Sequence, residues 1–163
     1  MDDQRWMRRA VELTHLCPRS ESAFAVGAVI VSPGSSPGTF PDGAPFPGAS
    51  PDLEIASGFS RDDDPLVHAE ESALLKVAGD PRLRTATLYS TLEPCSKRNS
   101  RPHATCVNLI IAAGIPRVVI AWREPDIFVT CEGIGLLTDA GIEVVELPEF
   151  AGPAMAANAH LIR

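Results

Sequence analysis

The sequence predicts a three-layer α/β/α domain with a central mixed five-stranded sheet. Short, branched apolar segments alternate with segments of helical spacing along most of the 163 residues, as is typical of strands and helices packed in layers. The first two predicted strands have no helix between them, which indicates an antiparallel pair and hence a mixed sheet. One domain is expected over residues 1–147, with residues 148–163 as a C-terminal helical extension of it.

The composition narrows the possible functions. A formal net charge of −7 and a pI near 5.0 disfavour nucleic acid as a partner, because that binding depends on neutralising phosphates. No stretch approaches the roughly 18 apolar residues of a membrane span, and no secretory signal is visible, so a cytoplasmic protein is expected. Because no export signal is visible, the four cysteines do not indicate disulfides. Cys17 and Cys131 are expected to be small buried residues.

The first predicted elements are a helix and two strands. Residues 2–17 place apolar side chains at helical spacing, and Trp6 and Met7 are expected in the core. Residues 25–31 form a continuous apolar run typical of a strand that is covered on both faces. Residues 53–59 alternate weakly and are expected to return as an antiparallel strand.

Between these strands lies a stretch rich in proline and glycine, residues 32–51, which can be neither helix nor central strand. We expect an insertion, with a surface flap as the alternative. Phe40 and Phe46 are the side chains that would pack if it were ordered.

The second half of the chain continues the alternation. The acidic run Asp62–Asp64 is expected to be a solvated start of the helix that carries His68. Gly114 is expected to end a later helix. The remaining elements are expected as helix 66–77, strand 86–91, helix 106–113, strand 117–121, helix 133–140, strand 142–146 and helix 149–163.

Three side chains form a candidate metal site: His68, Cys95 and Cys106. A catalytic zinc ion takes three nitrogen or sulfur ligands from the protein and leaves a fourth position open. Glu70 stands two residues after the histidine, close enough to carry protons without being a ligand. The pattern therefore predicts zinc as the cofactor and Glu70 as the catalytic residue.

The local context of the two cysteines supports this prediction. Cys95 follows Pro94 at the carboxyl end of a predicted strand, where α/β sheets place their ligands, and Cys106 begins a predicted helix. The partial positive charge at a helix N-terminus favours the thiolate. His103 is a possible competing ligand, but we expect a structural or substrate-contact role for it.

The pattern H-x-E followed by P-C and a later cysteine resembles the zinc-dependent nucleobase deaminases. Ten residues separate the two cysteines, and this wide spacing, with the run 90–96, resembles the pyrimidine deaminases of riboflavin biosynthesis. The resemblance continues through residues 109–115, 117–121 and 140–144. It implies a cytidine-deaminase-like fold, hydrolytic release of ammonia from an aminated pyrimidine, and a homodimer or homotetramer.

The closest substrate type that the resemblance implies is the diaminopyrimidine ribosyl phosphate of the riboflavin pathway. Lys97 and the two arginines near it form either a solvated loop or a phosphate clamp. The Asn-Pro of that family is absent before Val26-Gly27, and Phe24-Ala25 stand there instead. Trp122 and Phe128 either stack on a heterocycle or pack in the core. The candidate substrate-binding residues are Phe24, Glu93, Lys97, Arg98, Arg101, His103 and Trp122.

Other functions stay open at this point. The enzyme alternatives are a cytidine, deoxycytidylate or guanine-type deaminase of nucleotide or secondary metabolism. The alternative of another class is a non-catalytic, zinc-stabilised binding module. Such a module would need the three ligands but not a proton carrier, so Glu70 favours an enzyme with a small heterocyclic or nucleotide substrate.

Overall fold

The computed structural model describes residues 1–35, 41–42, 48, 50–125 and 132–162. Phe40, Phe46, Phe128 and Cys131 lie outside the described residues. Five strands form one sheet of order β2-β1-β3-β4-β5, in which β1 is antiparallel to both neighbours and β3, β4 and β5 are parallel. The predicted mixed five-stranded sheet is therefore confirmed. The strands are β1 Gly27–Ser32, β2 Leu53–Phe59, β3 Thr87–Ser90, β4 Arg117–Ile120 and β5 Glu143–Glu146.

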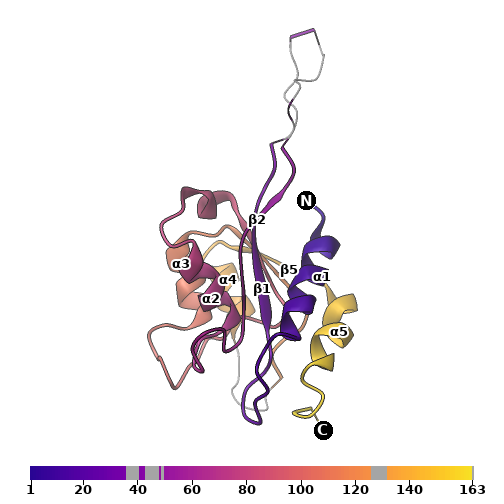
Figure 1. Ribbon diagram of the computed structural model, residues 1–163. Coiled ribbons are helices and arrows are strands. Elements are labelled where there is room, and N and C mark those ends of the chain that lie inside the picture. The colour runs from indigo at the N-terminus through magenta and orange to yellow at the C-terminus, as the bar shows by residue number, and fades with distance from the viewer. Residues whose placement is uncertain (36–40, 43–47, 49, 126–131, 163) are drawn as a thin grey trace.

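Helices cover both faces of the sheet (Figure 1). Helices α1 and α5 lie on one face, and α2, α3 and α4 lie on the other. None of the helices in the described part of the chain has the length and apolar character needed to cross a bilayer. The helices are α1 Asp3–Thr14, α2 Ala69–Lys76, α3 Cys106–Ala113, α4 Gly133–Asp139 and α5 Ala151–Ala156, with 3-10 turns η1 Pro81–Thr85 and η2 Pro148–Phe150.

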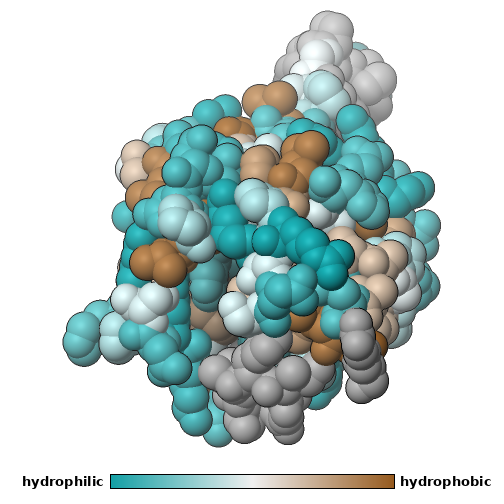
Figure 2. Space-filling view, turned by 60° about the horizontal axis from the view of Figure 1, so that its bottom comes forward, coloured by the Kyte–Doolittle hydropathy of each residue, from teal (hydrophilic) through white to brown (hydrophobic). Residues whose placement is uncertain are grey.

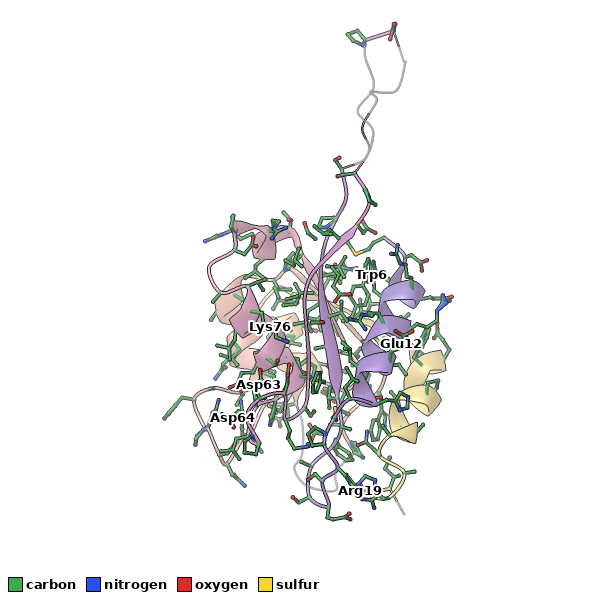
Figure 3. The ribbon with its side chains drawn as sticks, viewed as in Figure 1. Trp6, Glu12, Arg19, Asp63, Asp64 and Lys76 are labelled. Carbon is green, nitrogen blue, oxygen red and sulfur yellow. The ribbon has the colours of Figure 1, made fainter. Side chains whose placement is uncertain are left out.

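The central strands are apolar on both sides because each face of the sheet has its own core. In β3, Leu88 packs in the core beneath α2 and α3, while its neighbour Tyr89 packs in the core beneath α1. Successive side chains on a strand point to opposite faces, so a continuous apolar run fills both cores. Trp6 and Met7 are buried between α1 and the sheet, as predicted. Figure 3 labels Trp6 at this place.

Helix α2 approaches β2 closely at Gly58. A Cβ atom at Gly58 would lie 2.5 Å from the carbonyl oxygen of Ala69 and 2.6 Å from the amide nitrogen of Ala73. Only glycine allows this approach, which fixes the first turn of α2 against the sheet. The first turn of α2 carries Glu70, so this contact positions part of the candidate site.

The termini of the predicted helices differ most from the structure. The helix predicted over 2–17 ends at Thr14, and the half-buried thiol of Cys17 then donates to the Val26 carbonyl at 3.4 Å. The helix predicted over 149–163 is reduced to η2 and the short α5, because Gly152 and Pro153 weaken the helix and Asn158 turns to another partner. All five strands lie within two residues of their predicted bounds.

The start of α1 is tied to the sheet by Asp3. Its carboxylate accepts two hydrogen bonds of 2.8 Å from the Arg117 guanidinium and one of 2.6 Å from the Tyr89 hydroxyl. Arg117 lowers the pKa of Asp3 below its ordinary value of 3.8, although burial opposes the shift. The ionised carboxylate is therefore the form that stabilises the fold.

Replacing Asp3 by asparagine should lower the free energy of unfolding by about 1–2 kcal/mol at neutral pH, since charge-assisted hydrogen bonds are lost. Because the pKa of Asp3 is depressed in the folded chain, this stabilisation is present above about pH 4 and is lost as the pH falls through the folded value. Urea denaturation of both proteins at about pH 7 and about pH 3 should show the difference shrinking in acid. An equal difference at both pH values would contradict this assignment.

Candidate metal centre and active site

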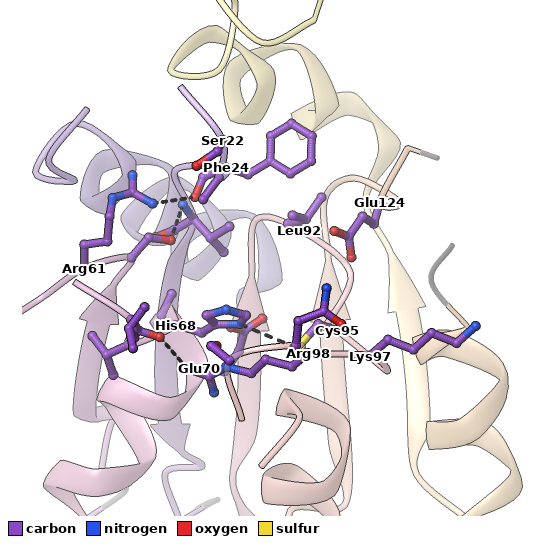
Figure 4. Close-up of a pocket in the computed structure, with 18 of the residues that line it drawn as sticks. Ser22, Phe24, Arg61, His68, Glu70, Leu92, Cys95, Lys97, Arg98 and Glu124 are labelled. Carbon is purple, nitrogen blue, oxygen red and sulfur yellow. Dashed lines mark hydrogen bonds between the residues drawn. The ribbon is translucent and has the colours of Figure 1, made fainter. Parts of the chain in front are cut away.

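The candidate site lies where β3 ends and where α2 and α3 begin (Figure 4). His68 is the residue immediately before α2, with extended backbone angles of φ −88° and ψ 160°. The prediction that His68 lies inside a helix over 66–77 is therefore wrong, and the helix begins at Ala69. The loop before it has positive φ angles at Arg61 and Asp63, and the chain reaches helical geometry only after His68, whose own backbone is extended.

Cys95 and Cys106 come together although ten residues separate them. The thiol of Cys95 lies 3.5 Å and that of Cys106 3.4 Å from Nδ1 of His68. Cys106 is the first residue of α3, and its backbone N–H donates to the Cys95 sulfur at 3.3 Å. Thr105 caps α3 by accepting from the Asn108 N–H at 3.2 Å, which fixes the direction in which the helix begins.

The three ligand atoms fit a zinc ion by their chemistry and spacing. All lie within 4.8 Å of one another, and one imidazole with two thiols is a zinc donor set. A hydrogen bond from Cys106, together with His68, lowers the pKa of Cys95 to about 4, whereas the shared hydrogen bond and complete burial raise the pKa of Cys106. Cys95 is thus the first to ionise, and both cysteines must be thiolates to bind a metal.

Glu70 is a buried carboxyl group beside these ligands, only 3% exposed. One of its oxygens accepts from the Ser90 hydroxyl at 2.9 Å, and the other lies 3.3 Å from the Cys106 sulfur. Burial, with the negative charge of Cys95, raises the pKa of Glu70 above its ordinary value. A carboxyl group with a raised pKa, held next to a metal site, is suited to taking up and releasing a proton.

A cavity of about 480 Å³ opens onto His68, Glu70 and Cys95. Its opposite wall includes Phe24, from the segment that leads into β1, and Leu92. The volume lies in the range of small-molecule sites. Figure 2 turns the end of the molecule that holds this site towards the viewer and shows a largely hydrophilic surface with scattered apolar residues.

The wall that carries Phe24 is held from three directions. Arg61 donates to the Phe24 carbonyl at 3.2 Å, and the Phe24 ring packs edge-on against Trp122 with 5.3 Å between centroids. Asn158, 1% exposed, accepts from the Ala25 N–H at 2.6 Å and donates to the Ala25 carbonyl at 3.0 Å. The C-terminal segment therefore supports the cavity, a role that its sequence does not indicate.

The predicted substrate-binding residues are only partly brought together. Phe24, Glu93, Lys97 and Arg98 line the cavity, whereas Arg101, His103 and Trp122 are not among its lining residues. His103 is exposed and lies outside the cluster of possible metal ligands in the described chain. For all seven residues, contact with the substrate stays a prediction.

The arginines predicted to clamp a phosphate are engaged with the protein itself. The guanidinium groups of Arg98 and Arg101 both contact the carboxylate of Glu71, and Arg101 also contacts Asp64 at 2.9 Å. The exposed Lys97 forms no ion pair with any described residue, and Figure 4 shows its side chain extending away from His68 and Glu70. Of the three predicted cations, Lys97 alone is therefore in position to meet a phosphate without giving up an ion pair within the described chain.

Glu93 organises backbone around the cavity. Its two carboxylate oxygens accept from the N–H groups of Glu124 at 3.2 Å and Ile134 at 3.0 Å. Beside it, a Cβ atom at Gly133 would lie 2.2 Å from the Pro94 carbonyl oxygen, so α4 can begin there only at a glycine. The predicted substrate role of Glu93 has a structural alternative in these contacts.

The acidic run before α2 is more than a solvated helix start, contrary to the prediction. Asp62 accepts from the Ser72 hydroxyl at 2.8 Å and from the Lys76 ammonium at 2.9 Å. Asp64 lies in the same loop and accepts from the Leu66 N–H at 2.8 Å (Figure 3). The sequence gives no signal for these partners, just as it gives none for the pairing of Glu71 with two arginines about 30 positions later.

Comparison with known proteins places the chain among deaminases. The sequence model described as the cytidine and deoxycytidylate deaminase zinc-binding region matches residues 1–122. The chain is 38% identical over 146 residues to a diaminohydroxyphosphoribosylamino-pyrimidine deaminase of Schizosaccharomyces pombe, covering 88% of this chain and 31% of that protein. It is 34% identical over 152 residues to the riboflavin biosynthesis protein RibD of Escherichia coli, covering 88% of this chain and 33% of that protein.

Solved structures agree with the fold. The structure of Acinetobacter baumannii RibD, form 1, superposes with a TM-score of 0.69 at 29% identity, covering 96% of this chain and 38% of that one. The Aspergillus oryzae Rib2 deaminase at pH 4.6 superposes with a TM-score of 0.72 at 23% identity, covering 99% and 97% of the two chains, and supports the fold alone. The chain spans about a third of the length of the Schizosaccharomyces pombe and Escherichia coli relatives. With the His68, Cys95 and Cys106 cluster at the predicted place, the chain belongs to the family of the cytidine and deoxycytidylate deaminase zinc-binding region.

Proposed function

We propose that the protein is a zinc-dependent hydrolytic deaminase of an aminated pyrimidine or related heterocycle. The observation that carries the proposal is the position of Glu70: a buried carboxyl group beside a complete set of three zinc ligands, at a cavity of ligand size. A zinc site with a purely structural role is usually closed by four protein ligands and needs no proton carrier. The arrangement therefore favours catalysis over a zinc-stabilised binding module.

The chain's own residues divide the chemistry among them. His68, Cys95 and Cys106 would hold zinc, which supplies Lewis acidity that lowers the pKa of a coordinated water to about 7. Glu70 would accept a proton from the attacking water and deliver it to the exocyclic amine, and its raised pKa favours holding the proton between these two transfers. The Ser90 hydroxyl donates to one carboxylate oxygen of Glu70 and so holds the carboxyl group in one orientation. In the net reaction, the oxygen of the water bonds to the ring carbon that bears the amine, the C–N bond to that amine breaks, and the departure of ammonia leaves a carbonyl group on the ring.

The substrate class that we favour is a diaminopyrimidine ribosyl phosphate. The Schizosaccharomyces pombe relative is named as a deaminase of this compound, and the Escherichia coli relative is named as a protein of riboflavin biosynthesis. The cavity volume is large enough for a small nucleotide. Lys97, whose ammonium is exposed, is the side chain that we propose for the phosphate. A cytidine, deoxycytidylate or guanine substrate is the alternative, and the one-domain organisation, the cytoplasmic location and the homo-oligomer stay predictions.

The test is ammonia release by the zinc-loaded protein with cytosine, cytidine, deoxycytidylate, guanine and diaminopyrimidine ribosyl phosphate, each with chelator-treated protein as the control. We expect turnover of the diaminopyrimidine compound alone. Turnover of another member of the panel would reassign the substrate and leave the reaction type standing. No turnover of any compound by protein that holds one zinc per chain would favour the binding module.

A further inference from the structure

One guanidinium group, that of Arg98, contacts the backbone beside two of the three predicted zinc ligands. It donates to the carbonyl oxygen of Leu66, two residues before His68, and to that of Ala104 at 2.9 Å, two residues before Cys106. Arg98 itself stands three residues after Cys95, the third ligand. A single planar group thus joins the chain segments that carry all three ligands.

The charge of Arg98 is buried and compensated. Its side chain is 2% exposed, and it contacts the carboxylate of Glu71, whose side chain is 6% exposed. Glu71 follows Glu70 in the first turn of α2, so the contact also fixes the loop after Cys95 against that turn. A buried ion pair holds its geometry better when it makes further hydrogen bonds, and here the two terminal nitrogens of Arg98 donate to two backbone carbonyl groups, whereas the buried Nε has no partner among the described residues.

We propose that Arg98 is a positioning residue that preorganises the zinc site. The ten residues between Cys95 and Cys106 form a loop whose ordering costs conformational entropy, and Arg98 fixes that loop through contacts that involve no metal ligand. Groups outside the ligands that orient them typically change metal affinity by about 10–100-fold. The inference rests on the zinc site of the proposed function but does not depend on which compound is deaminated.

The experiment measures the zinc dissociation constant of the full chain by competition with a chromophoric chelator. Arg98→Met removes all three contacts and keeps an unbranched chain about as long as the aliphatic part of arginine. Arg101→Met is a matched control, because it also removes a contact with Glu71 but none with Leu66 or Ala104. Lys97→Met controls for the lost charge, and Asp3→Asn controls for a loss of stability away from the site. Circular dichroism of each zinc-free protein shows whether it is folded.

We expect the dissociation constant to rise about 10–100-fold in Arg98→Met and to change less than about threefold in the three controls. A folded Arg98→Met chain that binds zinc as the unmodified chain does would overturn the proposal. If that variant does not fold, Arg98→Lys decides, since one ammonium keeps the charge but cannot span three acceptors. If Arg98→Lys binds zinc with unchanged affinity, or does not fold even with zinc present, the proposal is overturned and Arg98 has a general structural role. Zinc affinity is measured without substrate, so this result is independent of the proposed reaction.

Discussion

Glu70→Gln should lower turnover of the substrate by about 10²–10⁴-fold, the usual contribution of a positioned general acid and base. Glutamine has nearly the shape of glutamate and can still accept from Ser90, so the cavity and the three ligands keep their places. It cannot carry a proton. The rate of ammonia release under saturating substrate, measured with zinc content in the same samples, checks the prediction.

The zinc content shows whether a loss of turnover comes from the missing proton carrier or from missing zinc. We expect one zinc per chain in both proteins, because Glu70 is not a ligand in this arrangement. Glu12→Gln serves as the control, since Glu12 is exposed on α1 (Figure 3) and is not among the residues that line the cavity. Turnover of Glu70→Gln within tenfold of the unmodified protein would show that another group carries the proton.

Cys106→Ala should abolish both zinc retention and turnover. Cys106 is fully buried and provides one of three ligand atoms, so the remaining two would leave the ion weakly held. A loss of zinc affinity greater than about 100-fold is expected, beyond the range that groups outside the ligand set produce. Metal analysis after dialysis against a weak chelator, with ammonia release on the same samples, measures both effects.

Cys17→Ala is the matched control for this prediction. Cys17 is also a free thiol, but it donates to the Val26 carbonyl and is not part of the ligand cluster. It should keep one zinc per chain and nearly full turnover. Equal zinc content in the Cys106 and Cys17 variants would refute the ligand assignment.

Much of this protein follows from the sequence because its informative signals are local. Branched apolar runs mark strands buried on two faces, and the strands lie within two residues of the expected bounds. The helix over 106–113 has the predicted bounds, since Thr105 caps its start and Gly114 adopts the left-handed conformation at its end. His68, Cys95 and Cys106 were recognisable because ligands of this kind stand at the ends of such elements.

Only the tertiary structure decided what these side chains contact. The periodicity of a sequence indicates which residues are buried but not which distant residues they contact. The sequence therefore did not predict the ion pair of Glu71 with Arg98, or the hydrogen bonds of Asn158 with Ala25, which lies 133 positions away. The same holds for His68, which has an extended backbone and lies just before α2, after a loop that contains two residues of positive φ. Basic residues beside a cysteine suggested a phosphate clamp, but a buried carboxylate nearby binds both arginines, because a charge removed from water must be paired.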